Sequence, residues 1–508
     1  MLAKALSFAL WGIEAYPIEI EVDVANGLPA ITLVGLADTA IRESRERVKS
    51  AIKNSGFLWP PSRITISLAP SDIKKEGACF DLAIALGILA ATGQLNPELL
   101  NGNCILGELS LDGSLRPVRG VLPISIALAR TKNRKIILPL QNAKEAAVVT
   151  DIAVFPLQSL RQCVEFLHNP EFTQPFRMDI KGLFRENACY GEDFSEVKGQ
   201  YFAKRAIEVA VSGGHNILMQ GPPGSGKTML AKRIPTIMPE LSLEEALEVT
   251  KVHSVIGNML FGGGIITLRP FRSPHHSISA AALVGGGTIP VPGEISLSHQ
   301  GVLFLDELPE FRRDCLEALR QPLEDGQISI SRVSKSLRFP AWFMLVCAMN
   351  PCPCGYYTDP KRNCSCGTSK IQNYMGKISG PLLDRIDIHI ELPSIKYKEL
   401  TDTRESESSA AIKARVEMCR ARQRERFKSE GIFYNAQMNT RLIKKYCLLD
   451  EQAKELLRLA MTELGFSARA YDRILKISRT IGDLAGVEMI SAEYISEAIQ
   501  YRSLDKQY

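Results

Sequence analysis

The sequence contains no long hydrophobic run. No stretch approaches the roughly 18 consecutive apolar residues that a membrane-spanning helix needs, although hydrophobic residues make up 45% of the 508-residue chain. The first residues, MLAKALSFALWGIEAYP, include a short apolar stretch that Glu14 interrupts, and no small-residue cleavage site follows. We therefore expect a cytoplasmic protein without membrane association.

The chain also has no strong excess of charge of one sign. Lys and Arg outnumber Asp and Glu by 61 to 56, which gives a formal net charge of +5. Such a mild excess by itself neither indicates nor excludes a nucleic-acid partner. The balance is that of an ordinary globular protein, so bulk disorder is not expected. The length predicts about two to four domains.

Cysteine is not scarce, since the chain has 12. Most are scattered among apolar residues, which fits a reducing compartment better than a disulfide framework. Four are clustered in PCPCGYYTDPKRNCSC, as Cys352, Cys354, Cys364 and Cys366. Two such thiolate pairs on one loop could close a tetrahedral Zn²⁺ site. Because the spacing departs from the usual C-x₂-C, an iron–sulfur cluster and free or redox-active thiols remain alternatives.

Apolar periodicity separates an N-terminal part from the rest of the chain. Residues 1–167 have the pattern of mixed strands and helices, with strands at 64–70 and 134–139 and a buried helix at 80–93. Residues 168–189 are rich in Pro and polar residues and have the composition of a linker.

The remainder of the chain changes character twice. Within residues 190–395, apolar runs of strand length occur at 215–220, 302–306 and 342–349, which is typical of central parallel strands covered on both faces. Residues 396–508 begin with a polar connector and then have helical apolar spacing throughout. The predicted architecture is a multidomain α/β protein with a C-terminal helical lid.

The segment GPPGSGKT, residues 221–228, follows an apolar strand and opens a predicted helix. Such a glycine-rich loop wraps closely around phosphates, with backbone N–H groups and the helix N-terminus facing the anion. Lys227 would bind the β- and γ-phosphates, and Thr228 would offer its hydroxyl to Mg²⁺. We predict an ATP site made by Gly221, Pro222, Pro223, Gly224, Ser225, Gly226, Lys227 and Thr228.

Acidic and amide side chains follow two further predicted strands. Asp306 ends the strand 302–306 and is placed to hold the Mg²⁺ shell, while Glu307 would orient the attacking water. Asn350 follows the strand 342–349 and could position the same water. Taken alone, the acidic pair could be a helix cap and the asparagine a turn residue before Pro351.

Basic side chains beyond the core are candidate transition-state ligands. Arg385, in GPLLDRIDIHIEL, could reach the γ-phosphate bound by a neighbouring subunit. An ion pair with Asp384 or Asp387 is the simpler alternative. Arg469, in FSARAYDRIL, opens a lid helix and could touch the phosphates of its own subunit. Arg473, one helical turn later, competes with Arg469 for this role.

Four segments, 27–52, 269–311, 350–356 and 467–486, resemble the ComM/YifB family within the magnesium-chelatase branch of the AAA+ ATPases. The resemblance implies a homo-hexameric DNA helicase that drives branch migration on single-stranded and branched DNA during natural transformation, alongside recombination proteins. ATP would bind between subunits, with Arg385 supplied by the neighbour and Arg469 as the lid sensor. The alternative is a chelatase-type ATPase that remodels a protein or metal-insertion partner.

The N-terminal part resembles the protease domain of Lon, in residues 74–93, 106–123 and 135–145. The resemblance implies an α+β domain with Cys79 where Lon carries its nucleophilic serine and Leu128 where it carries the catalytic lysine. A thiol without a base is not an activated nucleophile. We therefore predict a degenerate protease domain with a structural or assembly role.

DNA contacts are expected at three places. In the glycine-rich insert at about 253–298, Phe271 could stack on a base and Arg272 could bind a phosphate; a loop packed on its own subunit is the alternative. The predicted hairpin 325–340 would carry Arg332 and Lys335 near its turn. The helix 411–428 has seven basic and two acidic residues between its first and last lysine, although such a helix more often faces water or an acidic neighbour.

Overall fold

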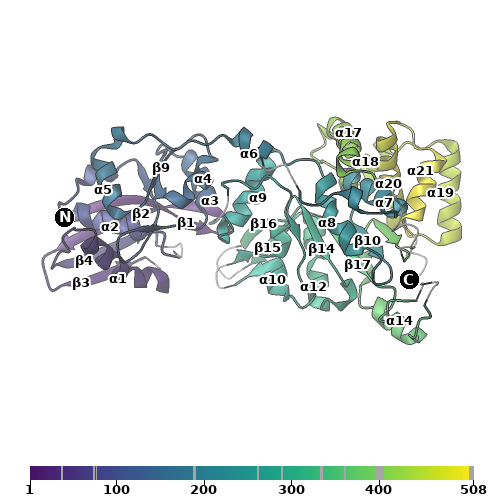
Figure 1. Ribbon diagram of the computed structural model, residues 1–508, viewed down its shortest axis with the longest axis horizontal. Helices are drawn as coiled ribbons and strands as arrows, with labels where there is room; N and C mark the ends of the chain where they lie inside the picture. Colours follow the sequence, from purple (N-terminus) through teal and green to yellow (C-terminus); the bar gives the residue numbers. More distant parts are fainter. Residues whose placement is uncertain are drawn as a thin grey trace. The chain divides into compact units, whose positions relative to one another are not determined.

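The computed structural model describes residues 1–35, 38–71, 75, 77–186, 190–259, 263–287, 290–331, 336–357, 359, 362–394 and 406–502. The chain forms two compact units (Figure 1): Met1–Asn187 with Ser242–Thr267, and Ala188–Leu241 with Leu268–Tyr508. Among the helices of these described ranges, none has the length and apolar character needed to cross a bilayer.

The first unit is built on a mixed seven-stranded sheet. The sheet has the order β3-β4-β2-β1-β5-β8-β9, in which β1, β2 and β4 are antiparallel neighbours and the other pairs are parallel. Its strands are Leu2–Trp11 (β1), Glu14–Ala25 (β2), Ala30–Val34 (β3), Arg63–Ala69 (β4), Asn103–Ile105 (β5), Lys135–Pro139 (β8) and Ala153–Leu157 (β9). The predicted strands at 64–70 and 134–139 are confirmed.

Helices cover this sheet because its strands alternate in burial. In β4, for example, Ile64, Ile66 and Leu68 point into the core. The predicted helix at 80–93 is α2, which is apolar all round and buried along its whole length. The helices of this part are Thr39–Asn54 (α1), Asp81–Ala91 (α2), Val121–Ala129 (α3), Ala143–Ala147 (α4), Leu160–His168 (α5) and Ile180–Glu186 (α6).

A helix from much later in the chain completes the first unit. Helix α9 (Leu243–Val255) begins at a capping box formed by Ser242 and Glu245. It packs against α3, and the Ser254 hydroxyl donates to the buried carboxylate of Glu145. The same carboxylate accepts the backbone N–H of Leu122 at 3.0 Å. Residues 242–267, expected to belong to the nucleotide-binding part, therefore fold with the N-terminal part.

The second unit has a parallel sheet at its centre. Its order is β11-β14-β17-β10-β18, and every described pairing in it is parallel. The three predicted apolar strands are confirmed as β10, β14 and β17, all fully buried. The bounds are Phe271–Arg272 (β11), Val302–Leu305 (β14), Met344–Met349 (β17), Ile217–Gln220 (β10) and Ile388–Glu391 (β18).

Short elements surround this sheet. The predicted hairpin is present as the antiparallel pair β15–β16. The elements are Tyr201–Gly213 (α7), Lys227–Ile237 (α8), Ala280–Val284 (α10), Gly285–Gly286 (β12), Val291–Pro292 (β13), Glu294–Leu297 (α11), Arg313–Ala318 (α12), Arg320–Asp325 (α13), Gln327–Ser331 (β15), Ser336–Pro340 (β16), Thr368–Met375 (α14) and Gly380–Leu383 (α15).

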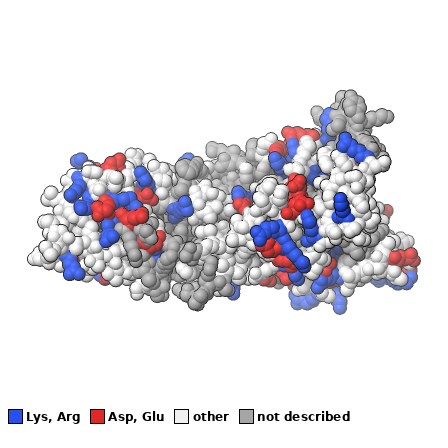
Figure 2. Space-filling view, turned by 90° about the horizontal axis from the view of Figure 1, so that it is seen from below, with Lys and Arg blue, Asp and Glu red and all other residues white. Residues whose placement is uncertain are grey.

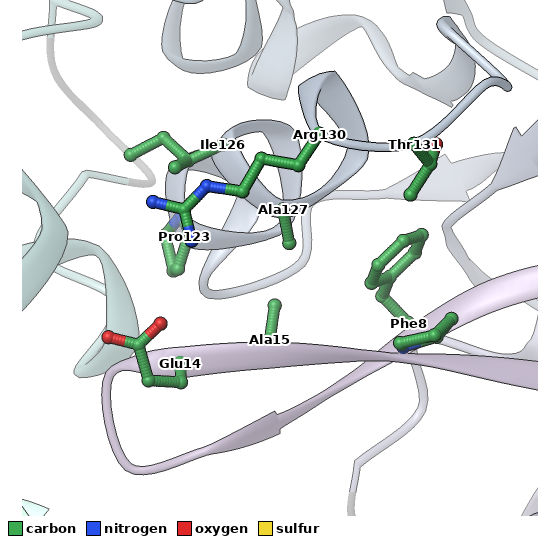
Figure 3. Close-up of a pocket in the computed structure, with 9 residues that line it drawn as sticks. Phe8, Glu14, Ala15, Pro123, Ile126, Ala127, Arg130 and Thr131 are labelled. Atoms are coloured by element: carbon green, nitrogen blue, oxygen red, sulfur yellow. The ribbon is translucent and has the colours of Figure 1, made fainter.

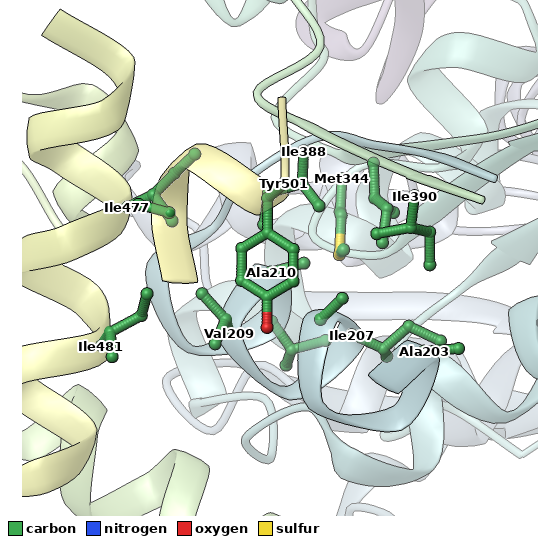
Figure 4. Close-up of a cluster of buried hydrophobic side chains, with 14 of the residues drawn as sticks. Ala203, Ile207, Val209, Ala210, Met344, Ile388, Ile390, Ile477, Ile481 and Tyr501 are labelled. Carbon is green, nitrogen blue, oxygen red and sulfur yellow. The ribbon is translucent and has the colours of Figure 1, made fainter. Parts of the chain in front are cut away.

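The C-terminal part is helical and shares one core with the sheet. Its helices are Ser409–Phe427 (α17), Thr440–Tyr446 (α18), Glu451–Leu464 (α19), Ala468–Ala485 (α20) and Ala492–Gln500 (α21). Tyr501 is fully buried between Ile477 of α20, Ala210 of α7 and Ile388 of β18 (Figure 4). Because α17 and α20 both pack on α7, this part is not separated from the nucleotide-binding part at 395, where we placed the boundary.

Candidate nucleotide site

The phosphate loop connects β10 to α8 through backbone conformations that glycine adopts easily. Gly224 and Gly226 have φ values of 76° and 82°. Gly221 is needed for a different reason, because a Cβ there would lie 2.4 Å from the carbonyl oxygen of Leu392. The sequence therefore forms the tight turn that directs backbone N–H groups at an anion.

Lys227, the first residue of α8, is held inside this loop. Its ammonium donates to the carbonyl oxygens of Gly221 at 2.7 Å and Pro222 at 3.0 Å, and to Oδ1 of Asn350 at 3.2 Å. Burial lowers the pKa of Lys227, while the carboxylates of Asp306 and Glu307 act in the opposite direction. The lysine is thus a fixed positive charge at the place where the loop would receive phosphate oxygens.

Thr228 and Asp306 bring two oxygen ligands together beside the loop. The threonine hydroxyl donates to Oδ2 of Asp306 at 2.8 Å. The other carboxylate oxygen of Asp306 accepts the backbone N–H of Glu307 at 2.9 Å. Hydroxyl and carboxylate oxygens next to a phosphate pocket are the ligands that Mg²⁺ prefers, so these residues fit the predicted metal.

Asn350 reaches the same edge because its strand is a neighbour of both others. Strand β17 lies between β14 and β10, and the carboxyl ends of parallel strands meet at one edge of a sheet. Lys227, Asp306 and Asn350 follow three different strands and converge there. The structure therefore brings together every residue that we predicted for ATP and Mg²⁺ in 221–228, 306–307 and 350.

Glu307 has a neighbour that the sequence did not identify. Its backbone is in the left-handed region, with φ 55°, and its carboxylate lies 3.3 Å from Nδ1 of His276. The His276 ring is 4.0 Å from that of His275. Nothing in the local sequence signals the contact, because it depends on β11 lying next to β14.

Gln200 is a second residue that sequence reasoning missed. It has φ 52° immediately before α7, and its side-chain amide donates to the carbonyl oxygen of Ser225 in the phosphate loop. Its Oε1 atom is buried without a hydrogen-bond partner among the described residues. The signal that marks Gln200 is its left-handed backbone beside the phosphate loop. The sequence does not give backbone angles, so this signal is visible only in the structure.

Arg385 lies at the other edge of the same sheet. The backbone carbonyl of Arg385 accepts from Asn216, the residue before β10, at 2.9 Å. Because β10 has four residues, this point is about 13 Å from the phosphate loop. The guanidinium pairs with Glu324, and its Nε is buried without a partner among the described residues. This position fits an arginine that acts on another subunit's nucleotide.

Arg469 lies near Arg385 and not at its own phosphate loop. It forms an ion pair with Asp384 at 2.7 Å, and it contributes, after burial and Arg320, to lowering the pKa of Arg385. The predicted contact of Arg469 with the phosphates of its own subunit stays a prediction, and in this structure the side chain contacts Asp384, next to Arg385. Arg473 is bound there as well, donating to the carbonyl oxygen of Ile386 at 3.1 Å.

Phe271 and Arg272, predicted to contact DNA, both have partners within the unit, and their DNA contact stays a prediction. These residues form β11, and the ring of Phe271 stacks on that of Phe304 at 5.9 Å. The guanidinium of Arg272 donates to both carboxylate oxygens of Glu294, at 2.6 and 2.7 Å. Both side chains thus belong to the edge of the central sheet, where each is partly exposed, and a DNA contact would require Arg272 to exchange Glu294 for a phosphate.

The other two predicted DNA contacts are the hairpin, of which the structure describes only a part, and helix α17, which it describes in full. Arg332 and Lys335 lie outside the described residues, but Arg338 of the same hairpin is exposed. In α17, three of the six basic side chains pair with carboxylates within the unit: Lys413 with Glu240, Arg415 with Glu208, and Arg426 with Asp483. Figure 2 shows the lower side of Figure 1, which is not the side of α17, and there the described Lys and Arg side chains are intermixed with Asp and Glu. The helix is a weaker candidate than the hairpin.

The four clustered cysteines come together in space. One sulfur from each of Cys352, Cys354, Cys364 and Cys366 lies within 4.8 Å of the others. The backbone N–H of Tyr356, and then the Cys352 side chain, lower the pKa of the Cys354 thiol to about 5. These residues could hold a metal that prefers thiolate ligands.

Among the described residues of the first unit, polar groups do not converge around Cys79 in a comparable way. Burial, and then the Asp81 carboxylate, raise the pKa of the Cys79 thiol to about 12. Leu128 is fully buried in an apolar cluster against which Cys79 packs. A cavity of about 210 Å³ lies elsewhere in this unit, between α3 and the β1–β2 pair (Figure 3). It is smaller than most ligand pockets.

These observations define the class of the protein. The parallel sheet carries a phosphate loop, two oxygen ligands suited to Mg²⁺ and a polar residue at the end of the strand between them. This arrangement is the nucleotide site of a P-loop ATPase. Two family models, described as magnesium chelatase subunit ChlI and as subunit ChlI of Mg-chelatase, match residues 193–400 and 20–142, and a model of the ChlI C-terminal part matches residues 406–502.

Full-length relatives narrow the class to one family. The chain is 44% identical over 508 residues to competence protein ComM of Haemophilus influenzae, covering 99% of this chain and 98% of that protein. It is 42% identical over 507 residues to YifB of Salmonella typhimurium, with 99% and 98% covered. A shorter match is to Lon protease 2 of Bacillus subtilis, which is 26% identical over 180 residues, covering 32% of this chain and 32% of that protein. The chain belongs to the ComM/YifB family of magnesium-chelatase-like AAA+ ATPases.

Proposed function

We propose that this protein is an ATP-driven DNA translocase that unwinds and branch-migrates DNA as a homo-hexamer in the cytoplasm. The observation that supports the motor is the contact of Thr228 with Asp306 beside Lys227, since this set of groups binds Mg·ATP. The name of the Haemophilus relative supports a task in competence, where incoming single strands are integrated by homologous recombination.

Within such a hexamer, each nucleotide would be bound by two subunits. One subunit supplies Lys227, Asp306 and Glu307, and its neighbour supplies Arg385. Arg469 lies beside Arg385, so we assign it to the same neighbouring-subunit role. For the arginine to act, its guanidinium must exchange Glu324 for a phosphate, a stronger anionic partner.

Hydrolysis measured with different DNA structures tests the proposal. We expect single-stranded DNA or a four-way junction to raise the steady-state ATPase rate several-fold above the DNA-free rate, and Lys227→Ala to abolish both. Arg338→Ala, on the hairpin, is expected to reduce the stimulation while leaving the DNA-free rate intact. Arg424→Ala is the matched control, because Arg424 is an exposed arginine of α17.

A chelatase-type ATPase is the second candidate, favoured by the three ChlI matches that together span most of the chain. Such a motor would act on a protein or metal-insertion partner. Robust hydrolysis that no DNA changes would overturn the DNA translocase and support this candidate.

A further inference from the structure

The sulfur atoms of the cysteine cluster are arranged as the corners of a small polyhedron. Sγ of Cys352 is 3.3 Å from that of Cys354 and 3.7 Å from that of Cys364, and the sulfurs of Cys354 and Cys364 are 3.5 Å apart. A disulfide would require about 2.05 Å. Four sulfurs at about 2.3 Å from a central Zn²⁺ would be separated by about 3.8 Å. The observed separations are close to the second arrangement.

The environment of the sulfurs also fits a metal–thiolate centre. The backbone N–H of Cys366 donates to Sγ of Cys364 at 3.3 Å, and such outer contacts orient metal ligands. Cys352 is fully buried, while the other three are half-buried. Arg362, two residues before Cys364, carries a positive charge of the sign that offsets the two negative charges that four thiolates leave around Zn²⁺.

The same loop is in direct contact with the phosphate loop. Gly355, between the second cysteine and the tyrosines, has φ +87°, and its N–H donates to the carbonyl oxygen of Cys352 at 2.9 Å. A Cβ at Gly355 would lie 2.6 Å from Cδ of Pro223. Only a glycine lets this turn approach the phosphate loop so closely. Two residues before Cys352, Asn350 accepts the hydrogen bond from Lys227.

We propose that Cys352, Cys354, Cys364 and Cys366 bind one structural Zn²⁺, which fixes the Gly355 turn against Pro223 and thereby holds the phosphate loop ready for ATP. Without the metal, the turn loses its closure and the phosphate loop loses packing on one side. The coupling rests on the proposed nucleotide function, whereas the metal site does not.

Metal content tests the site itself. Protein purified without chelator is expected to contain about one zinc per chain by elemental analysis, and the double variant Cys364→Ser with Cys366→Ser is expected to contain almost none. Cys79→Ser is the matched control and should retain zinc. Co²⁺ replacement should give the visible absorption of tetrahedral thiolate coordination. Wild-type protein with little zinc, or with the visible absorption of an iron–sulfur cluster, overturns the assignment.

Nucleotide affinity tests the coupling. Release of zinc from the wild type, and Gly355→Ala with zinc retained, should each weaken binding of a fluorescent ATP analogue about tenfold, less than the hundredfold that a 1 Å misplacement can cost. Gly367→Ala is the control on the same loop, because a Cβ there would meet nothing within 4 Å.

The outcomes separate the two claims. Loss of zinc with unchanged nucleotide affinity overturns the coupling. Absence of ATP binding in zinc-loaded wild type overturns the proposed motor and leaves the zinc measurement standing. Because Gly355→Ala could disturb folding, zinc content and thermal unfolding are measured on the same sample, and zinc release from the wild type gives the same comparison without a mutation.

Discussion

The nucleotide site and the Cys79 region both match sequence patterns of catalytic centres, but only one is assembled as a centre. At the nucleotide site, residues that follow three different strands meet at one sheet edge, where Lys227 donates to Asn350 and Thr228 donates to Asp306. Around Cys79, the thiol packs on an apolar cluster, and Asp81 is occupied by Arg47 at 2.9 Å. A sequence pattern typical of catalysis forms an active site only if its polar groups converge around a space that can hold the substrate. Where they do not converge, the same residue types contribute to packing.

The largest effect is expected from removing the cation of the nucleotide site. Lys227→Ala should lower steady-state ATP hydrolysis by about 100-fold or more, since a preorganised charge facing the phosphates is lost. Lys232→Ala, an exposed lysine on the same helix, should leave hydrolysis nearly unchanged. Equal rates in the two variants would mean that the convergence at this edge is not a catalytic site.

Arg385→Ala is expected to be nearly as severe, with turnover reduced by about 100-fold and nucleotide affinity retained, because the arginine stabilises charge only in the transition state. Its position at the far edge predicts action on another subunit. Mixing Arg385→Ala with Lys227→Ala should therefore restore measurable hydrolysis in mixed oligomers. Two inactive variants that stay inactive together would assign the arginine to its own subunit.

A smaller effect concerns the buried carboxylate of the first unit. Burial raises the pKa of Asp81 to about 6, with Arg47 opposing the shift. Because the folded protein then binds the proton more tightly, the contribution of Asp81 to stability is present below pH 3.8 and is lost as pH rises through about 6. Thermal unfolding between pH 4 and 7 should show this loss in the wild type and less of it in Asp81→Asn. Identical pH profiles would show that Asp81 does not titrate in this way.

The smallest effect is expected from Cys79→Ser. A protonated, packed thiol without a base contributes no nucleophile, so ATP hydrolysis should not change and the melting temperature should shift by only a few degrees. Peptide cleavage that is present in the wild type and lost in this variant would overturn the contrast between the two regions.

The residues of the nucleotide site could be predicted from the sequence because each follows an apolar strand in an unmistakable local pattern. Residues 221–228 form a phosphate-binding motif that is complete within one short segment. Asp306 and Asn350 could be placed beside it because the carboxyl ends of parallel strands meet at one edge of a sheet. The strands themselves were predictable because β10, β14 and β17 are continuous apolar runs.

The sequence could not show the contacts of side chains whose partners are distant in the chain. Arg272 next to an aromatic residue looks the same in a sequence whether it faces DNA or Glu294, which lies 22 residues later. The partner of Arg469 is 85 residues away, so its position at the edge beside Arg385 was not visible. Local patterns specify elements and motifs, whereas the choice of partner depends on packing.

Helix α9 has a consequence for how the protein can be synthesised and divided. Because α9 completes the first unit, that unit cannot finish folding when residue 187 has been translated; it must wait until residue 267 leaves the ribosome. Until then, the surface of the first unit that α9 covers remains exposed, and in a fragment that begins at residue 188 the buried Ala246, Val249 and Val252 of α9 would be exposed to aggregation. A C-terminal fragment that begins at residue 188 would therefore retain α9 with its apolar side chains exposed. The two units are best expressed as one polypeptide.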